Sequence, residues 1–335
     1  MPQSGAIGRR AFLGGLAGVA TTGLACRRDA VRGRLVLRLS HSMVAATNSL
    51  HLFATAFRRR LEAATNGEVT LRLFPSGTLG QEREIVQQVQ EGLVDFMASG
   101  SAIWGSVAPR LQVLDFPFLW RDPEHIHHVL DGPVGLEVSD YLRQSARMRP
   151  LSWGDSFGFR QVVTRSRDIR TPADLSGLKI RTIQSSIYVK AMELMGANPT
   201  PMAFGEVYTS LQTGVIDGFE HDASTTLQQR FYEVGRVMTR TRHIAGVLGL
   251  WMSTESESRL PPGLLPIVET AAREASAEQR AAGPREEADA LKVLQARGMR
   301  VGDLDTAEFR ARAEAFWQSE ARALNVTRWL DAIRA

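Results

Sequence analysis

The sequence has few of the features that would indicate covalent cross-links or a nucleotide-dependent enzyme. Its 335 residues include one cysteine, Cys26, so no disulfide can form within the chain and the fold has to rest on its core. There is no His-Glu-x-x-His run, phosphate-binding loop or dinucleotide fingerprint. No repeat of fixed period stands out. We therefore expect neither a bound metal nor a cofactor.

An excess of charge of one sign is also missing. The net charge of +4 includes Arg9 and Arg10, and residues 1–25 contain no acid, so removing them leaves +2. The other charged residues are mixed in sign along the predicted helices, which argues against a nucleic-acid-binding face. Hydrophobic residues make up 44% and charged residues 23%, as is ordinary for a soluble globular protein. The length suits one large or two ordinary domains.

The N-terminus has the features of an export signal. Arg9-Arg10-Ala-Phe-Leu13 resembles a twin-arginine signal, and the apolar run that follows it to Ala25 is too short to span a bilayer. Leu24-Ala25-Cys26 resembles a lipoprotein processing site, although Gly23 stands where an aliphatic residue is usual. We expect residues 1–26 to be an export signal for the periplasm. Lipid attachment at Cys26 and ordinary cleavage both remain open.

Strand and helix patterns alternate in the next part of the chain. Apolar periodicity and glycine punctuation predict strands at Arg34–Ser40, Val69–Leu73 and Leu93–Met97, and helices at Asn48–Ala64 and Gln81–Gln90. This alternation predicts βαβ units and a mixed or parallel sheet. Polar residues in the segments after the strands are expected to collect on one edge of that sheet; they are Ser42, Glu82, Ser99 and Ser101.

The stretch from Gly177 to Tyr232 predicts two further βα units. The strands are placed at Lys179–Thr182 and Val215–Phe219, and the helices at Ser185–Met195 and Gly205–Gln212. Ligands of open α/β sheets lie beyond the carboxyl ends of the strands. Arg181 and the triplet Glu220-His221-Asp222 fall at such ends. We therefore expect a fixed cation and an imidazole to face one crevice.

Several ordered motifs carry a resemblance to a known family. They are Phe74-Pro-Ser-Gly77, Phe116-Pro-Phe-Leu119, Gly158-Phe-Arg160, Gly177-Leu-Lys-Ile-Arg181, Pro199-Thr-Pro-Met-Ala-Phe204-Gly-Glu-Val-Tyr208, Leu211-Gln-Thr-Gly-Val-Ile-Asp-Gly218 and Phe231-Tyr-Glu-Val234. In this order they resemble the DctP-like substrate-binding proteins of tripartite ATP-independent periplasmic (TRAP) transporters. The resemblance covers roughly residues 34–330.

The resemblance implies a two-domain clamshell in which mixed α/β sheets are flanked by helices, with a hinge and long C-terminal helices. Domain I would comprise residues 34–156 and about 246–285, and domain II residues 157–245 and about 286–335. The implied function is capture of a small organic acid and its delivery to integral-membrane subunits for uptake driven by an ion gradient. No cofactor is implied. Monomer and dimer both remain open.

The resemblance also implies roles for single residues. Arg181 corresponds to the arginine that clamps the solute carboxylate, and its planar fork suits two parallel hydrogen bonds. Arg160 corresponds to a second arginine of the pocket. His221 stands where the family often has asparagine, and Phe204 corresponds to an aromatic floor under the solute. These are the strongest candidates for binding.

Other candidates come from the domain crossover and from the first domain. Trp153 and Asp155 precede Arg160, and Asp155 would either accept hydroxyl hydrogen bonds or cap a hinge. Ser42, Glu82, Ser99 and Ser101 are expected either in the pocket or on solvated loops. Gly100 stands where a sialate-binding relative has glutamate, which disfavours sialic acid. Uronates, other sugar acids, dicarboxylates and keto acids remain open.

Two alternatives remain beside transport. One is a sensory module that uses the same clamshell to report a ligand. The other is a metal-dependent enzyme that uses Glu220-His221-Asp222 or His125-Ile-His127-His128. Adjacent strand residues point to opposite faces, which makes a tight site from the triplet awkward. The histidine cluster is expected instead to begin a helix with its rings partly exposed.

Overall fold

The computed structural model describes residues 34–44, 49–155 and 157–335. The predicted export signal, residues 1–26, and its Cys26 lie outside these ranges. Among the described residues, no helix combines the length and apolarity needed to cross a membrane.

The first of two sheets has five strands in the order β2-β1-β3-β10-β4. β1 runs parallel to β2 and β3, whereas β10 is antiparallel to β3 and β4. The strands are β1 (Leu35–Ser40), β2 (Val69–Phe74), β3 (Phe96–Gly100), β4 (Met148–Trp153) and β10 (Leu248–Ser253).

The second sheet has six strands in the order β11-β9-β5-β8-β6-β7. β6 is parallel to β7 and β8, and β5 is antiparallel to β8 and β9. The strands are β5 (Gln161–Thr164), β6 (Lys179–Thr182), β7 (Asn198–Pro201), β8 (Gly218–His221), β9 (Val237–Arg240) and β11 (Arg300–Asp303).

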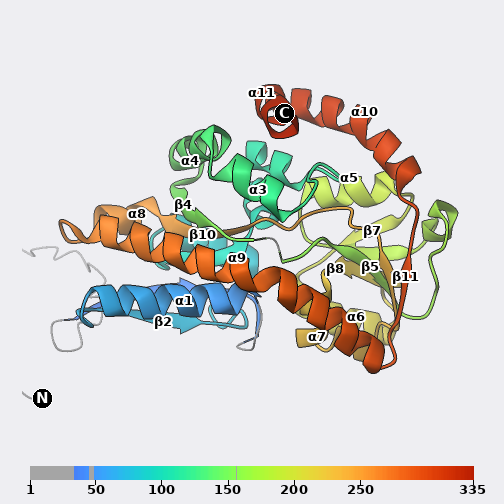
Figure 1. The fold of residues 1–335 in the computed structure, drawn as a ribbon, viewed down its shortest axis with the longest axis horizontal. Helices are drawn as coiled ribbons and strands as arrows, with labels where there is room; N and C mark the ends of the chain where they lie inside the picture. The colour runs from blue at the N-terminus through green and yellow to red at the C-terminus, as the bar shows by residue number, and fades with distance from the viewer. Residues whose placement is uncertain (1–33, 45–48, 156) are drawn as a thin grey trace, which may run out of the picture.

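Helices cover both sheets, as Figure 1 shows. The α-helices are α1 (Ser49–Ala64), α2 (Glu82–Gln90), α3 (Pro123–Leu130), α4 (Pro133–Ala146), α5 (Ser186–Leu194), α6 (Val207–Thr213), α7 (Ala223–Gln228), α8 (Thr254–Ser258), α9 (Leu264–Ala296), α10 (Ala307–Ala323) and α11 (Thr327–Arg334). The 3-10 helices are η1 (Ser101–Ser106), η2 (Pro109–Asp115), η3 (Pro172–Leu175), η4 (Phe204–Glu206) and η5 (Phe231–Glu233). This arrangement confirms the predicted fold class of mixed α/β sheets flanked by helices, with long helices near the C-terminus.

Hydrophobic periodicity explains how these elements pack. Leu50, Phe53, Phe57 and Leu61 recur at helical spacing in α1 and are all buried. They pack with Leu37 and its neighbours on the first sheet and with the first half of α9. Hydrophobic burial of this kind is the main favourable term in folding. With one cysteine in the sequence, it carries the fold without an intrachain disulfide.

Helix α9 joins the two halves of the molecule. Its first half packs against α1, and its second half contacts α7 beside the second sheet, so that it runs along both (Figure 1). Pro284 lies inside this helix. A proline there removes one backbone donor and weakens the helix at that turn. The chain also crosses between the sheets after β4 and again before β10, so each sheet is built from segments that are separate in the chain.

The C-terminal helix departs from the predicted domain division. Residues 286–335 were assigned to the second domain, and α10 does pack there through Phe309 and Ala313. However, Trp329, Leu330 and Ile333 of α11 belong to the core that contains α3 and α4 of the first domain. The hydrophobic face of α11 is what brings the chain end back across the boundary.

Some predicted strands are displaced along the chain. Val215–Phe219 was expected as a strand, but β8 begins at Gly218 and ends at His221. Gly214 ends α6 with a left-handed φ of 80°, and the N–H groups of the next two residues bond to Ser210 O. The turn therefore uses the residues that were expected to start the strand. Leu93–Met97 is displaced similarly, because β3 occupies Phe96–Gly100.

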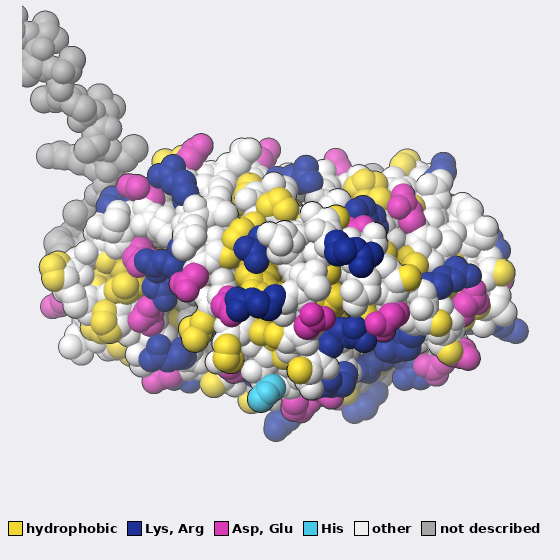
Figure 2. All heavy atoms as spheres, turned by 90° about the horizontal axis from the view of Figure 1, so that it is seen from above, with side chains coloured by type: hydrophobic (Ala, Val, Ile, Leu, Met, Phe, Trp, Pro, Cys, Tyr) yellow, Lys and Arg dark blue, Asp and Glu magenta, His cyan; other side chains and the backbone are white. Residues whose placement is uncertain are grey.

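The surface carries mixed charge. On the face shown in Figure 2, Lys and Arg side chains lie among Asp and Glu side chains. Charged residues form exposed ion pairs, such as Arg59 with Glu278 and Arg300 with Asp168. Exposed pairs contribute little to stability, with a median of roughly 0–1 kcal/mol.

The polar site lies where the carboxyl ends of parallel strands meet. β1 and β3 end at Ser40 and Gly100, and β6 and β8 end at Thr182 and His221. Parallel strands place these ends on one edge of each sheet. The residues that follow from both sheets line a common cavity.

Gly218 offers a test of how tightly β8 is held. A Cβ atom on Gly218 would press on Val163 O of β5 and lie 2.9 Å from Ile180 Cδ1 of β6, whereas one on Gly302 of β11 would meet nothing within 4 Å. We expect Gly218→Ala to lower the free energy of unfolding by ~1–3 kcal/mol through overpacking. Gly302→Ala, the control in the same sheet, should stay within ~0.5 kcal/mol. Urea unfolding of both variants checks this, and equal stability would contradict it.

Candidate functional site

A small enclosed cavity lies between the two sheets. Its volume is about 30 Å³, enough for about one water molecule. The lining residues come from both domains and are Met43, Glu82, Gly100, Ala102, Ile103, Phe157, Arg160, Arg181, Ile183, Tyr188, Phe204, His221 and Gly246. Of the residues predicted for binding, Arg160, Arg181, Phe204, His221 and Glu82 are therefore brought together.

Arg160 is held by a buried acid. Its Nε and Nη2 donate to the two carboxylate oxygens of Glu220, and Nη2 also donates to Glu220 O at 2.8 Å. His243 Nε2 lies 3.6 Å from the same carboxylate. Burial alone would raise the pKa of Glu220, but the charge and hydrogen bonds of Arg160, with His243 nearby, lower it to about 2. Both groups therefore stay ionised at neutral pH.

Arg181 is the second buried cation of the cavity, and its hydrogen-bond partner differs from that of Arg160. Its side chain is 1% exposed, and its Nε and Nη2 donate only to the carbonyl of Met202, at 3.2 and 2.8 Å. Within the described ranges it forms no ion pair. Burial lowers the pKa of Arg181 to about 10, with Arg160 acting in the same direction and Glu220 and Glu82 opposing. The guanidinium remains charged at pH 7, and no carboxylate among the described residues pairs with it.

His221 is the last residue of β8, and its ring contacts the carboxylate of the next residue, Asp222. Its Nδ1 lies 2.5 Å from Asp222 Oδ2, and its ring contacts Phe157 and Phe204 with centroid distances of 5.7 and 5.6 Å. Burial, together with the charge of Arg160, lowers the pKa of His221, while Asp222 acts in the opposite direction. The ring is therefore neutral at pH 7.

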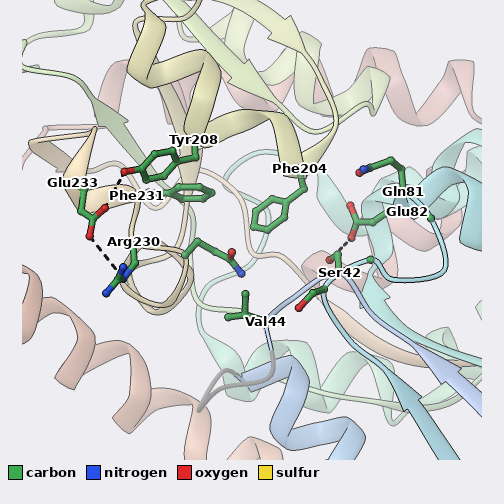
Figure 3. A pocket seen from close by; sticks show the side chains of 14 residues that line it. Ser42, Val44, Gln81, Glu82, Phe204, Tyr208, Arg230, Phe231 and Glu233 are labelled. Carbon is green, nitrogen blue, oxygen red and sulfur yellow. Dashed lines mark hydrogen bonds and ion pairs between the residues drawn. The ribbon is translucent and has the colours of Figure 1, made fainter.

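A wider cleft opens beside the cavity and shares Glu82 and Phe204 with it. Its volume is about 450 Å³. Figure 3 shows Ser42 and Glu82 of the first domain on one side and Phe204 and Tyr208 of the second on the other. Ser42 donates to Glu82 Oε1 at 2.9 Å. Burial raises the pKa of Glu82, although Ser42, Arg181 and Arg160 act against it.

Two predicted site residues near the domain crossover, Trp153 and Asp155, lie outside the cavity. Trp153 packs on Trp251 at a ring distance of 5.3 Å and borders a groove beside α9. Asp155 Oδ1 lies 3.4 Å from His127 Nε2, and Gln279 of α9 accepts from its backbone N–H. The backbone of both residues bonds to α9, because Trp153 O accepts from Ser276 Oγ and Arg280 Nε and the Asp155 N–H donates to Gln279. This position favours the hinge alternative for Asp155.

Ser99 and Ser101 fit neither expected location. Both are buried, so they are not on solvated loops, and neither lines the cavity. Ser99 Oγ accepts from the indole of Trp104 at 3.0 Å, and Ser101 Oγ donates to Asp115 at 2.8 Å. The displacement of β3 toward Gly100 places Ser99 inside the strand, and Ser101 begins η1 directly after it, so both side chains are buried in the packed layer.

Sequence reasoning missed Tyr188, Ile183, Phe157 and Met43, all of which line the cavity. Tyr188 lies on α5 at a position that reads as ordinary core, and its ring stands 5.2 Å from the Arg160 guanidinium. Behind it, Asp115 lies 3.4 Å from the Tyr188 hydroxyl, and burial raises its pKa to about 7. Only the order of strands and helices in space could have identified these residues.

The histidine cluster begins α3, as expected, but His125 is buried and its Nε2 lies 2.7 Å from Ile333 O of α11. In residues 34–44, 49–155 and 157–335, no three His, Cys, Asp or Glu side chains are grouped closely enough to hold a metal ion. The cation-rich cavity therefore stands as the candidate site.

Comparison with known proteins gives a consistent result. Residues 39–323 match the family described as bacterial extracellular solute-binding protein, family 7, DctP. The chain is 33% identical over 299 residues to the 2,3-diketo-L-gulonate-binding periplasmic protein YiaO of Escherichia coli (strain K12), covering 89% of this chain and 88% of that protein.

Solved structures of TRAP periplasmic solute-binding proteins share the fold. One from Pseudomonas putida F1 with bound D-glucuronate is 30% identical, has a TM-score of 0.84 and covers 90% of this chain and 98% of its own. One from Sulfitobacter sp. NAS-14.1 with bound β-D-galacturonate is 27% identical, with a TM-score of 0.85 and coverages of 89% and 99%. One from Polaromonas sp. JS666 with bound D-erythronate is 28% identical, with a TM-score of 0.85 and coverages of 90% and 99%.

The Arg160–Glu220 pair predicts a specific acid sensitivity. The pKa of Glu220 is about 2, below the ordinary glutamate value of 4.5, so the stability that it contributes is present above pH ~4.5 and is lost as the pH falls toward 2. Glu220→Gln should lower the free energy of unfolding at pH 7 by ~3–5 kcal/mol, because Arg160 loses its buried partner. It should also weaken the loss of stability between pH 4.5 and 2.

The control is Glu308→Gln, which removes an exposed pair with Arg312 one helical turn away. It should change stability by ~0.5 kcal/mol or less and leave the acid slope as in the unaltered chain. Urea titrations at several pH values provide the comparison. If Glu220→Gln and Glu308→Gln gave the same acid slope, the buried pair would not be its source.

Proposed function

The chain belongs to the DctP family of bacterial extracellular solute-binding proteins, which serve TRAP transporters, and on this premise we propose that Arg181 binds the carboxylate of a sugar acid. Capture of a small organic acid is the function of the family. The relatives named above bind D-glucuronate, β-D-galacturonate, D-erythronate and 2,3-diketo-L-gulonate. We extend the class of hydroxylated acids, rather than any one of them, to this chain.

The observation that carries the proposal is the unpaired charge of Arg181. A buried charge is stable only when it is paired or hydrogen-bonded, and this guanidinium bonds to one carbonyl alone in the described part of the chain. A solute carboxylate in the cavity would supply the missing partner. Arg160 is already paired with Glu220, so we assign it a secondary role that adds positive potential.

The other lining residues suit the rest of a sugar acid. Phe204 offers an apolar face, and its ring centroid lies 5.9 Å from the Arg181 guanidinium carbon. Glu82 can accept hydroxyl hydrogen bonds through oxygens that Ser42 does not fully occupy. His221 adds a ring nitrogen that can form a hydrogen bond with the solute. Cations for the carboxylate and acceptors for hydroxyls thus surround one space.

Binding requires the two domains to separate and close. A volume of about 30 Å³ is far too small for a sugar acid, so the cavity must widen before a solute enters. The lining residues belong to both domains, so contacts made only in the closed form can shift the equilibrium toward closure. We place the bend at the two crossovers and at Pro284 of α9, as in hinge closure around ligands.

Family membership supports the wider setting. Solute-binding proteins of TRAP transporters are periplasmic. We propose that residues 1–26 direct export and that the closed form delivers its solute to integral-membrane subunits for uptake driven by an ion gradient. The site needs no covalent step for this role, in keeping with a family of binding proteins.

Replacing Arg181 by alanine tests the proposal. Arg181→Ala should weaken binding of D-glucuronate and D-galacturonate by ~100-fold or more, because charged hydrogen bonds are worth about 1.5–3 kcal/mol each and a fork makes two. Arg181→Lys should recover part of the affinity, since it keeps the charge but loses the planar fork. Titration calorimetry provides the measurement.

The matched control is Arg300→Ala, which removes an exposed arginine of the same sheet that pairs with Asp168. It should leave affinity unchanged. Melting curves of each variant establish that it is folded. A folded Arg181→Ala protein with unaltered affinity would refute the clamp, and failure of every acid in the panel to bind the unaltered chain would refute the proposed solute class.

A further inference from the structure

Asp222 lies directly behind His221, the imidazole that lines the cavity. Its side chain is 0% exposed; Oδ2 is 2.5 Å from His221 Nδ1, and Oδ1 accepts the Thr225 N–H at 2.7 Å. A contact this short needs a hydrogen between the two atoms, because two lone pairs would otherwise face each other. The Asp222 N–H also approaches Nδ1, at 3.1 Å, but Oδ2 is the closer partner, so the geometry places the hydrogen on Nδ1 and directs it at Oδ2.

The position of that hydrogen fixes the chemistry of the other ring nitrogen. Because burial and Arg160 lower the pKa of His221, the ring is neutral at pH 7 and carries one hydrogen only. With Nδ1 protonated, Nε2 presents a lone pair. No hydrogen bond joins Nε2 to any residue in the described part of the chain, so it is available to a solute.

Relying on the proposed function, we propose that Asp222 is a positioning residue which makes His221 Nε2 a hydrogen-bond acceptor for a solute hydroxyl group. The site then selects acids that carry a hydroxyl within reach of Nε2 over acids that carry a keto oxygen there. A keto oxygen is also an acceptor, so two lone pairs would face each other and both groups would lose a partner on burial.

The surroundings hold Asp222 in this role. It is the N-cap of α7, and the next two N–H groups, of Ala223 and Ser224, donate to Glu287 of α9 at 3.0 Å each. Gly158 lies against both acids: with φ of +117°, a Cβ atom there would lie 3.0 Å from Asp222 Cβ and from Glu287 Cδ. The carboxylate of Asp222 is thus fixed by α7, α9 and the domain crossover.

This arrangement gives the cavity two kinds of recognition. Arg181 and Arg160 donate hydrogen bonds and carry charge, which suits the solute carboxylate. His221 Nε2 only accepts, which suits a hydroxyl. A dicarboxylate without hydroxyl groups would leave Nε2 unpaired, so the inference adds a selection for hydroxyl over keto groups within the proposed class of hydroxylated acids.

The first experiment measures the tautomer directly. Nitrogen NMR of the full chain, labelled with ¹⁵N-histidine, distinguishes protonated from unprotonated ring nitrogens, and His221→Gln identifies the signals of His221 by their loss. We expect Nε2 of His221 to be unprotonated at pH 7 without solute. In Asp222→Asn the carboxamide can donate to Nδ1, so the proton should move to Nε2.

The control is Asp217→Asn. Asp217 accepts the backbone N–H of Lys179 at 2.9 Å near the start of the same strand and is not in contact with the histidine. It should leave the His221 signals unchanged. A protonated Nε2 in the unaltered chain, or no change on Asp222→Asn, would overturn the inference.

The second experiment compares D-gluconate with 2-keto-D-gluconate, which differ at C2, by competition calorimetry against D-glucuronate. We expect the unaltered chain to favour the hydroxy acid by ~5- to 150-fold, and Asp222→Asn to reduce this ratio more than it changes overall stability. A ratio unaffected by Asp222→Asn would overturn the inference. If no acid binds, the proposed function fails, while the NMR result still decides the state of His221.

Discussion

The site depends on one physical constraint, the burial of two guanidinium groups of which Arg160 is paired with a carboxylate and Arg181 bonds to a backbone carbonyl. Glu220 is committed to Arg160 through both of its oxygens and its backbone carbonyl. Arg181 is left with the Met202 carbonyl as its acceptor among the described residues. Removing a cation from water is unfavourable unless a counter-charge is close. The protein therefore keeps a buried positive charge that an anionic guest can neutralise, and this links the fold to the function.

The fold produces this constraint by bringing strand ends together. Arg181 and His221 lie on neighbouring parallel strands, β6 and β8, and Arg160 precedes β5, which pairs with β8 on its other side. Glu82 begins α2, beside the other sheet, so elements from both sheets contribute polar groups to the cavity. Helix α9 contacts both halves and passes behind the site, where Glu287 bonds to the N-terminus of α7. Closure and the geometry of His221 are thus built on shared elements.

The sequence was informative where local signals are strong. Alternating leucines located β1, the α1 stripe located the core, and the motifs around Arg181 and Phe204 identified the family and the residues that line the cavity. It was less informative for features that depend on contacts between distant parts of the chain. β8 begins later than predicted because Gly214 extends the turn before it. Trp153, Asp155 and Ser99 contact Trp251, α9 and Trp104, respectively, and no local sequence pattern encodes these contacts. Tyr188 was missed because an apolar helix position looks the same whether it faces a core or a cavity.

The central claim is that the solute's negative charge is what the buried Arg181 requires. Calorimetric titration with D-glucuronate and D-galacturonate, and with their uncharged primary amides, tests it with the protein unaltered. The account predicts that each acid binds at least ~100-fold more tightly than its amide, since the amide keeps the hydroxyl groups and the shape but lacks the charge. Equal affinity for an acid and its amide would contradict it.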